Sequence, residues 1–172
     1  MSAPTLIEVP LRGMVPLAQD LARTCWYTCY DMMFKWRYGI DNSPVIRTEL
    51  SKIDIYDKSC VAGMQAENFK KAAKALGLSA WGFGQSLTAC DFRTWLPHTP
   101  VWVAGRWYDY NHNVIVIGIS DEQVKFIDPW WEVEKKASIL TWPIDAFLHG
   151  NRRDRNGTDH FLGWYSCQVW KD

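Results

Sequence analysis

The 172-residue sequence has no net charge, because 19 Lys and Arg residues balance 19 Asp and Glu residues. The basic residues are spread along the chain, so nothing indicates the basic patch that binds nucleic acid or an anionic membrane surface. No apolar run approaches the roughly 18 residues that span a bilayer. Residues 1–20 lack the basic start and continuous apolar stretch of a secretory signal peptide. We therefore expect no nucleic-acid partner, no membrane insertion and synthesis in the cytoplasm, with export by a non-Sec system left open.

Cysteine pairs and clusters are also lacking. The five cysteines are odd in number and irregularly spaced, at positions 25, 29, 60, 90 and 167. This spacing argues against a disulfide framework and fits a reducing compartment. There is no Cys-x-x-Cys pair and no close cluster of Cys and His, which are the usual ligands of zinc. We expect neither a metal nor another cofactor.

Apolar residues are plentiful, at 48% of the chain, and this content with this length predicts one folded domain over residues 1–172. Helical patterns come first, over 25–37, 63–76 and 88–96. Residues 38–60 are predicted as a covering loop or short irregular elements. Strand patterns follow, over 100–108, 111–119, 123–131 and 160–170. Helices followed by an antiparallel sheet form an α+β fold.

The stretch QDLARTCWYTCYDMMFKWR, from Gln19 to Arg37, holds the first candidate site residues. Thr24 is a good N-cap residue, so we expect a helix to begin at Cys25, with the Thr24 hydroxyl accepting a bond from an orphan backbone N–H. At a helix start, the free N–H groups and the helix dipole stabilise a thiolate, which is the nucleophilic form of cysteine. Gln19 lies on the preceding loop and has side-chain N–H donors that suit an oxyanion.

A lone cysteine is more often part of the core than a nucleophile. Cys29 illustrates the usual case, because it lies one turn further along the helix with Trp26, Met33 and Trp36 as apolar neighbours. We predict Cys29 to be a core residue. Cys25 differs from it by its position at the helix start and by a matching segment further along the chain.

This second segment contains His112 and Asp128. His112 opens one predicted strand and Asp128 ends the next, so the turn at 120–122 brings both to the same end of a hairpin. Asp128 can then orient the imidazole, and Cys25, His112 and Asp128 become a candidate nucleophile, base and orienting acid. The alternative is that His112 only caps a strand while Asp128 forms an Asx turn before Pro129.

The other three histidines are weaker candidates for a base. His98 lies in a loop between prolines, and His149 precedes a glycine in polar surroundings. His160 begins the last predicted strand and ranks second to His112, because no Asp or Asn lies on a following strand to orient it.

The two segments resemble the papain-like cysteine peptidases. The likeness lies in a Gln followed at the sixth position by Cys-Trp, and in a His followed sixteen residues later by a carboxylate. PVWVAGRW, NHNVIVIGIS and VKFIDPWW are similar to bacterial branches of the family, namely bacteriocin-exporter peptidase domains and avirulence cysteine proteases of plant pathogens. The resemblance covers residues 19–37 and 99–131. It implies a papain-like fold, with the nucleophile at a helix N-terminus packed on an antiparallel sheet.

The resemblance also implies a role for each matching residue. Cys25 becomes the nucleophile, His112 the base, and Asp128 its orienting acid, while Gln19 and the Cys25 backbone N–H stabilise the oxyanion. The chain departs from the family beside the histidine, where Asn111 and Asn113 replace the usual glycine. Bulkier neighbours there narrow access or change the substrate.

Several functions fit these residues. The first hypothesis is a peptidase that cleaves a protein or peptide substrate through an acyl-enzyme. A cell-wall amidase, a glutamine deamidase or a transglutaminase would use the same residues. A non-catalytic binding module is the third class, and the intact set of site residues speaks against it. We further hypothesise a secreted bacterial effector or toxin restrained by an inhibitory immunity protein, with an intracellular housekeeping peptidase as the alternative.

Overall fold

The computed structural model describes residues 6–40, 43–81, 87–107, 110–130, 136–149 and 164–170. These residues form six helices and one antiparallel sheet. The elements in chain order are β1 (Ile7–Glu8), α1 (Cys25–Tyr38), α2 (Ser43–Ser51), α3 (Tyr56–Ala62), α4 (Ala66–Ala75), β2 (Leu78–Trp81), α5 (Ala89–Trp95), β3 (Val101–Trp107), β4 (Tyr110–Ile119), β5 (Gln123–Asp128), β6 (Ser138–Pro143), α6 (Ile144–His149) and β7 (Trp164–Trp170).

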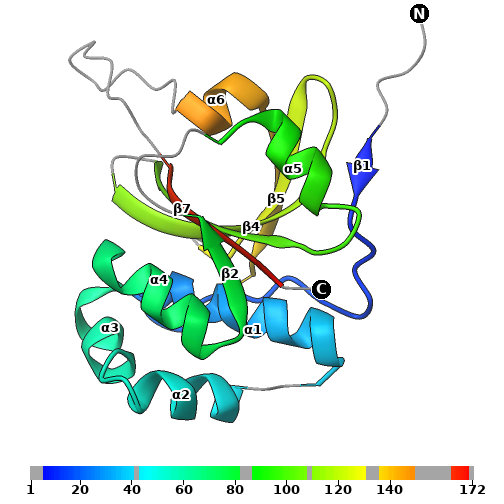
Figure 1. The fold of residues 1–172 in the computed structure, drawn as a ribbon. Helices are drawn as coiled ribbons and strands as arrows, with labels where there is room; N and C mark the ends of the chain where they lie inside the picture. Colours follow the sequence, from blue (N-terminus) through cyan, green and yellow to red (C-terminus); the bar gives the residue numbers. More distant parts are fainter. Residues whose placement is uncertain are drawn as a thin grey trace, which may run out of the picture.

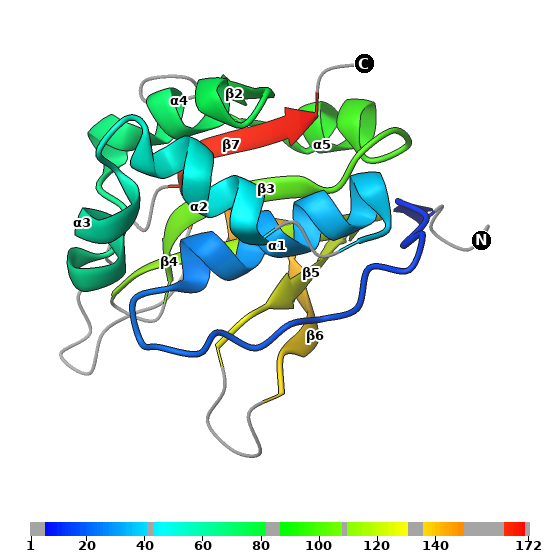
Figure 2. The ribbon, with the colours of Figure 1, turned by 90° about the horizontal axis from the view of Figure 1, so that it is seen from below.

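The seven strands form one antiparallel sheet in the order β2-β7-β3-β4-β5-β6, with β1 paired to β4. Helices α1 to α4 lie on one side of this sheet, and α5 and α6 lie on the other (Figures 1 and 2). The predicted α+β architecture is therefore confirmed. Among the described residues, we find no helix with the length and apolar character needed to cross a bilayer.

Each face of the sheet carries its own part of the hydrophobic core. Trp36 of α1 and Trp102 of β3 belong to the part under α1 to α4, where Trp102 stacks on Tyr30 with ring centroids 5.3 Å apart. Phe92 and Phe126 belong to the part under α5 and α6. This layering buries one side of α1 against the sheet, so the start of α1 is held in a fixed position beside β3 and β4.

Helix α1 begins at Cys25 as predicted, but its cap differs from the prediction. The Thr24 side chain makes no capping bond. Its hydroxyl donates to the Leu21 carbonyl at 2.9 Å and accepts from the Leu21 N–H at 3.2 Å. Thr24 therefore closes the turn before the helix, because a hydroxyl engaged with that turn does not reach the following N–H groups. The first N–H groups of α1 are consequently left without a Thr24 cap.

Residues 38–60 are the main correction to the predicted elements, since much of this segment is helical. Helix α2 covers 43–51, and the segment also contains the start of α3. Ile46 and Leu50 lie one turn apart and are both fully buried, and this spacing anchors α2 on the core. Two apolar positions are a weak periodic signal, which explains why the pattern did not predict a helix. Strand β6 was likewise not predicted.

The other predicted elements are confirmed over the described residues. Helix α4 begins three residues later than expected and stops before Gly77, whose φ of 75° suits glycine. Helix α5 begins with a capping box formed by Thr88 and Asp91. The last strand is observed over Trp164–Trp170, and residues 160–163, including His160, lie outside the described residues.

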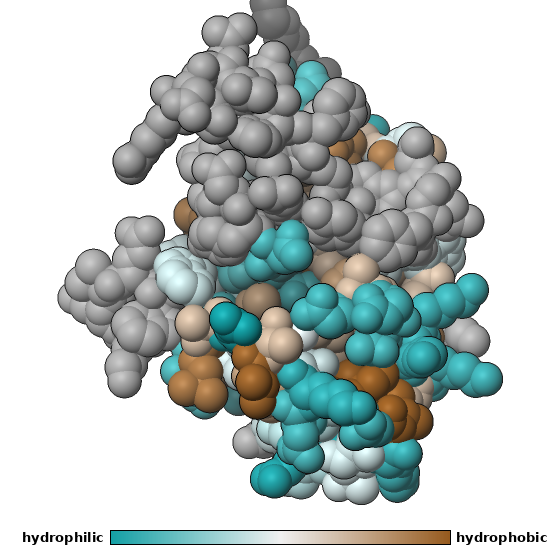
Figure 3. Space-filling model, turned by 90° about the vertical axis from the view of Figure 1, so that its left-hand side faces the viewer, coloured by the Kyte–Doolittle hydropathy of each residue, from teal (hydrophilic) through white to brown (hydrophobic). Residues whose placement is uncertain are grey.

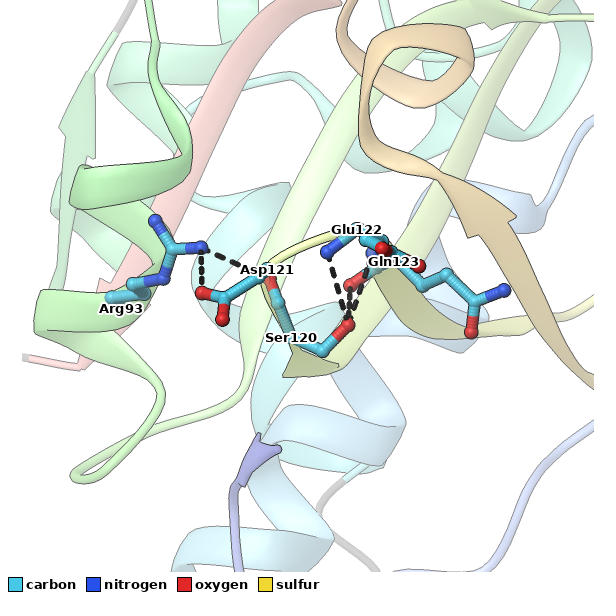
Figure 4. A network of polar contacts seen from close by, with 5 residues as sticks. All are labelled: Arg93, Ser120, Asp121, Glu122 and Gln123. Atoms are coloured by element: carbon cyan, nitrogen blue, oxygen red, sulfur yellow. Dashed lines mark hydrogen bonds and ion pairs between the residues drawn. The ribbon is translucent and has the colours of Figure 1, made fainter. Parts of the chain in front are cut away.

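A polar network closes the hairpin of β4 and β5 (Figure 4). The Ser120 hydroxyl accepts bonds from the backbone N–H groups of Glu122 and Gln123, at 3.3 and 3.0 Å. Arg93 of α5 donates to the Ser120 carbonyl and to the Asp121 carboxylate, both at 3.1 Å. The network fixes the turn and connects it to α5. It therefore fixes which residues of β4 and β5 pair next to the turn.

A β-bulge then changes that register. Gly118 pairs with Lys125, whereas Val116 pairs with Phe126, so Ile117 is an extra residue in β4. An extra residue moves every later side chain of the strand to the opposite face relative to its partner strand. The bulge therefore decides which side chains share a face at the open end of the hairpin.

Candidate active site

Cys25 is the first residue of α1 and faces β4. Its side chain is largely buried, with 8% of the residue exposed. The sulfur is a hydrogen-bond donor to Asn113 Oδ1, with 3.4 Å between the two atoms. Because the helix start concentrates free N–H groups and the positive end of the helix dipole, this position stabilises negative charge on the sulfur and on groups bound next to it.

His112 and Asp128 meet because of the bulge in β4. Beyond it, Ile115 pairs with Ile127, so Asp128 falls on the same face of the hairpin as His112. Without the extra residue, Asp128 would lie opposite Ile115, whose side chain is on the other face. The bulge therefore brings together the two residues that the sequence predicts as base and orienting acid.

The contact between these two side chains is short and buried. His112 Nε2 and Asp128 Oδ1 are 2.6 Å apart, and the residues are 3% and 4% exposed. The same carboxylate oxygen accepts the backbone N–H of Trp130 at 2.8 Å. Asp128 thus forms the Asx-type turn before Pro129 and also holds the imidazole. The Asx turn of the alternative interpretation is therefore present together with the predicted contact between His112 and Asp128.

The surroundings of His112 favour its protonated form. Burial by itself lowers the pKa of His112, because it removes water from the charged ring. Hydrogen bonds to Asp128 and Cys25, together with the charges of these residues, outweigh burial and raise the pKa to about 9. Beside the negative charge of Cys25, His112 therefore stays protonated at neutral pH. Since Nε2 faces Asp128, Nδ1 is the ring nitrogen left for Cys25.

The other buried cysteines are poor nucleophiles. Burial, followed by the negative charges of Cys25 and Asp128, raises the pKa of Cys29 well above its ordinary value. Burial also raises the pKa of Cys167. Both side chains lie in the hydrophobic core and are fully buried. The prediction that Cys29 is a core residue is confirmed.

Gln19 lies in the loop that leads to α1 and is 2% exposed. Its backbone N–H donates to the Pro129 carbonyl at 2.9 Å, which joins this loop to the residue after Asp128. Its Nε2 donates to the Leu21 carbonyl at 2.7 Å. An amide nitrogen carries two hydrogens, so this bond uses one of them. The structure thus places Gln19 beside the segment that carries the acid.

A cleft of about 310 Å³ opens beside Cys25, between the starts of α1 and α4 and the facing ends of β3 and β4. Trp26 and Phe69 contribute apolar walls, while Arg23 and Glu67 contribute charged side chains of opposite sign. The sequence did not single out the start of α4 as part of the site. The sequence carries no local signal for this position, because the packing of α4 against β2 and β7 brings its start next to the cleft.

The rim of the cleft combines apolar and polar surface. Figure 3 shows this end of the molecule, where apolar patches lie among hydrophilic side chains over the helical part. Leu21 and Val61, the neighbours of cleft-lining Ala22 and Ala62, are 61% and 76% exposed. Arg23 bridges the two sides by donating to the Val61 carbonyl at 3.1 Å. Exposed apolar residues beside a cleft are typical of surfaces that bind other chains.

The remaining candidates lie elsewhere. His98 is exposed in the loop after α5, and His149 ends α6. In the part of the chain that the structure describes, no group of three or more His, Cys, Asp or Glu residues could hold a metal ion. The residue that sequence reasoning missed is Asn113, noted only as a departure beside the histidine, although it contacts the Cys25 sulfur.

Comparison with known proteins assigns this site to a family. Residues 8–145 match the family described as papain-like cysteine protease AvrRpt2. The chain belongs to this AvrRpt2 family of papain-like cysteine proteases. The match covers well over half of the sequence and includes all four predicted site residues, Gln19, Cys25, His112 and Asp128. No curated protein matches the chain significantly.

Two solved structures share the fold of this AvrRpt2-family chain. One is a double glycine motif protease from an AMS/PCAT transporter in complex with the leader peptide, with 18% identity, a TM-score of 0.56 and coverage of 96% of this chain and 95% of the other. The second is the peptidase domain of Streptococcus ComA, a bi-functional ABC transporter involved in quorum sensing, with 20% identity, a TM-score of 0.56 and coverage of 90% and 97%. The predicted papain-like fold and its bacterial branches are confirmed.

Proposed function

We propose that this cysteine protease hydrolyses peptide bonds with Cys25 as nucleophile, His112 as general base and acid, and Asp128 as the residue that orients His112. The observation that carries the proposal is the buried 2.6 Å contact between His112 and Asp128 beside a cysteine at a helix start. A protonated imidazole next to the sulfur stabilises a thiolate, as the helix start does. The imidazolium and the helix start therefore both stabilise negative charge on the Cys25 sulfur.

In the first half of the reaction, the Cys25 thiolate attacks the carbonyl carbon of the substrate and forms a carbon–sulfur bond. The carbonyl oxygen becomes an oxyanion, which the Cys25 backbone N–H and a Gln19 side-chain N–H stabilise. Collapse of this intermediate breaks the carbon–nitrogen bond. His112 gives its proton to the departing amine, and a thioester to Cys25 remains.

In the second half, water attacks the thioester while His112 accepts one of its protons. Collapse of the new tetrahedral intermediate breaks the carbon–sulfur bond and releases the carboxylic acid. The sulfur leaves as a thiolate beside the newly protonated imidazole, so the starting pair is restored. Asp128 keeps the ring in place throughout, because its carboxylate is itself fixed by the Trp130 N–H.

The substrate that we propose is an extended peptide in the cleft beside Cys25. The apolar walls and the exposed Leu21 and Val61 suit side chains of a peptide, and the charged residues at the rim suit its polar groups. The neighbour from the AMS/PCAT transporter is in complex with a leader peptide, which supports a peptide as the substrate class. Amidase, deamidase and transglutaminase reactions would use the same residues on another amide.

The proposal predicts selective alkylation of Cys25. Iodoacetamide near neutral pH should label Cys25 faster than the exposed Cys90. Both cysteines lie in the first turn of a helix, but Cys25 also has the imidazolium of His112 beside it. His112→Ala should lower the labelling rate of Cys25 at least about tenfold, since one of these two influences is lost. Mass spectrometry of the peptides that carry each cysteine measures both rates in the same sample.

Cys90 serves as the internal control in this experiment, since it is exposed and lies on α5. Equal labelling of both cysteines, unchanged in His112→Ala, would contradict the proposed nucleophile. Product analysis then separates the reaction classes. Cleaved peptides identify a peptidase, whereas ammonia released from an intact peptide identifies a deamidase or transglutaminase.

The effector or toxin role, with an inhibitory immunity protein as partner, stays a prediction. The match to the AvrRpt2 family is what supports it. Wild type and Cys25→Ala can be expressed in the cytoplasm and in the periplasm of a bacterium. If the protein is a toxin with bacterial targets, the wild type should arrest growth and Cys25→Ala should not. Equal growth of both proteins in both compartments would rule out this role for such targets.

A further inference from the structure

Asn113 is a buried polar residue at a position where its neighbours are apolar. It lies two residues from Ile115 on β4, and Ile115 belongs to the core under α1. Side chains two apart on a strand share a face, so Asn113 continues this apolar face toward the start of α1. It is 6% exposed. A buried polar residue in such a place is informative, because burial disfavours it unless its polar atoms are used.

Only one end of the Asn113 amide has a partner in the described part of the chain. Oδ1 accepts the bond from the Cys25 sulfur, with 3.4 Å between the atoms. Nδ2 is fully buried and has no hydrogen-bond partner among the described residues. Leaving a buried N–H donor without a partner is unfavourable. We therefore look for a second state of the site in which Asn113 Nδ2 donates a hydrogen bond.

The ionisation of Cys25 supplies that state. A thiol has a hydrogen to donate and suits an acceptor such as Oδ1, whereas a thiolate has none and suits a donor such as Nδ2. The two ends of an amide have nearly the same shape, so a half-turn about the Cβ–Cγ bond exchanges them without repacking the neighbours. The same side chain can thus meet the sulfur in both protonation states.

We propose that Asn113 is a further catalytic residue, whose amide accepts the Cys25 S–H through Oδ1 and, after a half-turn, donates from Nδ2 to the Cys25 thiolate. The inference rests on the proposed role of Cys25 as nucleophile. The proton that leaves the sulfur goes to the neutral imidazole of His112, which becomes the imidazolium paired with the thiolate, so the step needs no further reactant. The bond from Nδ2 stabilises the attacking form of the sulfur in a place with little water, where hydrogen bonds to charge are strong.

Charged and titratable groups on every neighbouring element also act on the sulfur. They are His112 on β4, Asp128 on β5, Cys29 on α1, and Arg23 and Glu67 in the cleft. Positive groups favour the thiolate and negative groups oppose it. Asn113 differs from all of them because it is uncharged and touches the sulfur directly. Its contribution should therefore persist in high salt, which screens the exposed Arg23 and Glu67.

The test is the pH at which alkylation of Cys25 by iodoacetamide reaches half of its maximal rate. Asn113→Leu keeps the size of the side chain and removes both hydrogen bonds, while Asn113→Asp keeps only acceptors and adds negative charge. We expect Asn113→Leu to raise the midpoint by about one pH unit, which is an about tenfold lower ratio of thiolate to thiol. Asn113→Asp should raise it further.

Asn68 provides the matched control. It is half-buried on α4 and is not among the residues that line the cleft, so Asn68→Leu and Asn68→Asp should leave the midpoint unchanged. An unchanged midpoint in both Asn113 variants, beside a raised midpoint in His112→Ala, would overturn the role of Asn113 alone. Unchanged midpoints in all three variants would overturn it together with the proposed function.

A measurement on the wild-type protein keeps the inference testable if these variants fold poorly. In protein labelled with ¹⁵N on asparagine side chains, the Asn113 amide signal should shift over the pH range in which Cys25 becomes reactive. The shift should vanish in Cys25→Ser, which retains a hydroxyl that does not ionise in this range. A stationary Asn113 signal in the wild type would overturn the inference.

Discussion

Replacing Cys25 with serine is expected to lower the rate of peptide cleavage at least about 10⁴-fold, the scale on which loss of a nucleophile acts in related catalytic groups. The substitution changes only the sulfur to oxygen. His112 and the start of α1 stabilise a thiolate, which a serine cannot form. The charge of Cys25 helps to raise the pKa of His112 to about 9, so the wild-type imidazole is matched to a thiolate. A serine hydroxyl is a much weaker acid than a thiol, so the same imidazole does not generate a comparable nucleophile from it. Mass spectrometry of a digested peptide library measures the loss.

Cys90→Ser is the control for this experiment, since it makes the same chemical change at an exposed site on α5. It should cleave the library at the wild-type rate. Circular dichroism of both variants shows that they remain folded. If Cys25→Ser kept a substantial part of the activity, another residue would have to be the nucleophile, and the proposed roles of His112 and Gln19 would fall with that of Cys25.

Local chemistry made part of this site predictable from the sequence. A cysteine at a helix start needs only the helix boundary, which the absence of Pro and Gly before Gly39 indicates. A hairpin with a short turn was enough to predict that His112 and Asp128 lie at the same end of the two strands. The short turn at 120–122 between two β-branched segments also predicted the antiparallel pairing on which the site depends. These signals are all carried within about 20 consecutive residues, where periodicity is most informative.

Tertiary geometry accounts for what the sequence could not give. A regular hairpin would place Asp128 opposite Ile115, on the wrong face, and only the extra Ile117 corrects this. Gly118 beside it is typical of a bulge, but one glycine does not specify how the register of the hairpin changes. Asn113 is similar, because its importance follows from the approach of α1 to β4 and not from its own neighbours in the chain. Thr24 was mistaken for a cap because its competing bond to Leu21 is equally local.

Replacing Asp128 with alanine is expected to lower the rate of peptide cleavage about 10²- to 10⁴-fold, the usual contribution of a positioned general base. His112 would lose the partner that fixes its ring at 2.6 Å. Asp128→Asn separates orientation from charge, since an amide oxygen can still accept from Nε2. It should therefore be less damaging than Asp128→Ala. Equal activity of wild type and both variants would show that the carboxylate does not orient the base.

The pH dependence of Asp128→Asn provides the sharper signature. Removing the carboxylate charge should lower the pKa of His112 from about 9, so the alkaline limb of the pH–rate profile should move to lower pH.

The stability of the folded protein should change with pH for the same reason. The pKa of His112 in the folded state lies above the ordinary value of about 6.5. The protonated His112 therefore stabilises the fold fully below about pH 6.5, and this contribution is lost as pH rises through about 9. The unfolding free energy of wild type should therefore exceed that of Asp128→Asn by at most about 3 kcal/mol at pH 6, and by less at pH 9.5. Urea unfolding at both pH values measures the difference. A difference that grew with pH would mean that the pair does not hold the proton on His112.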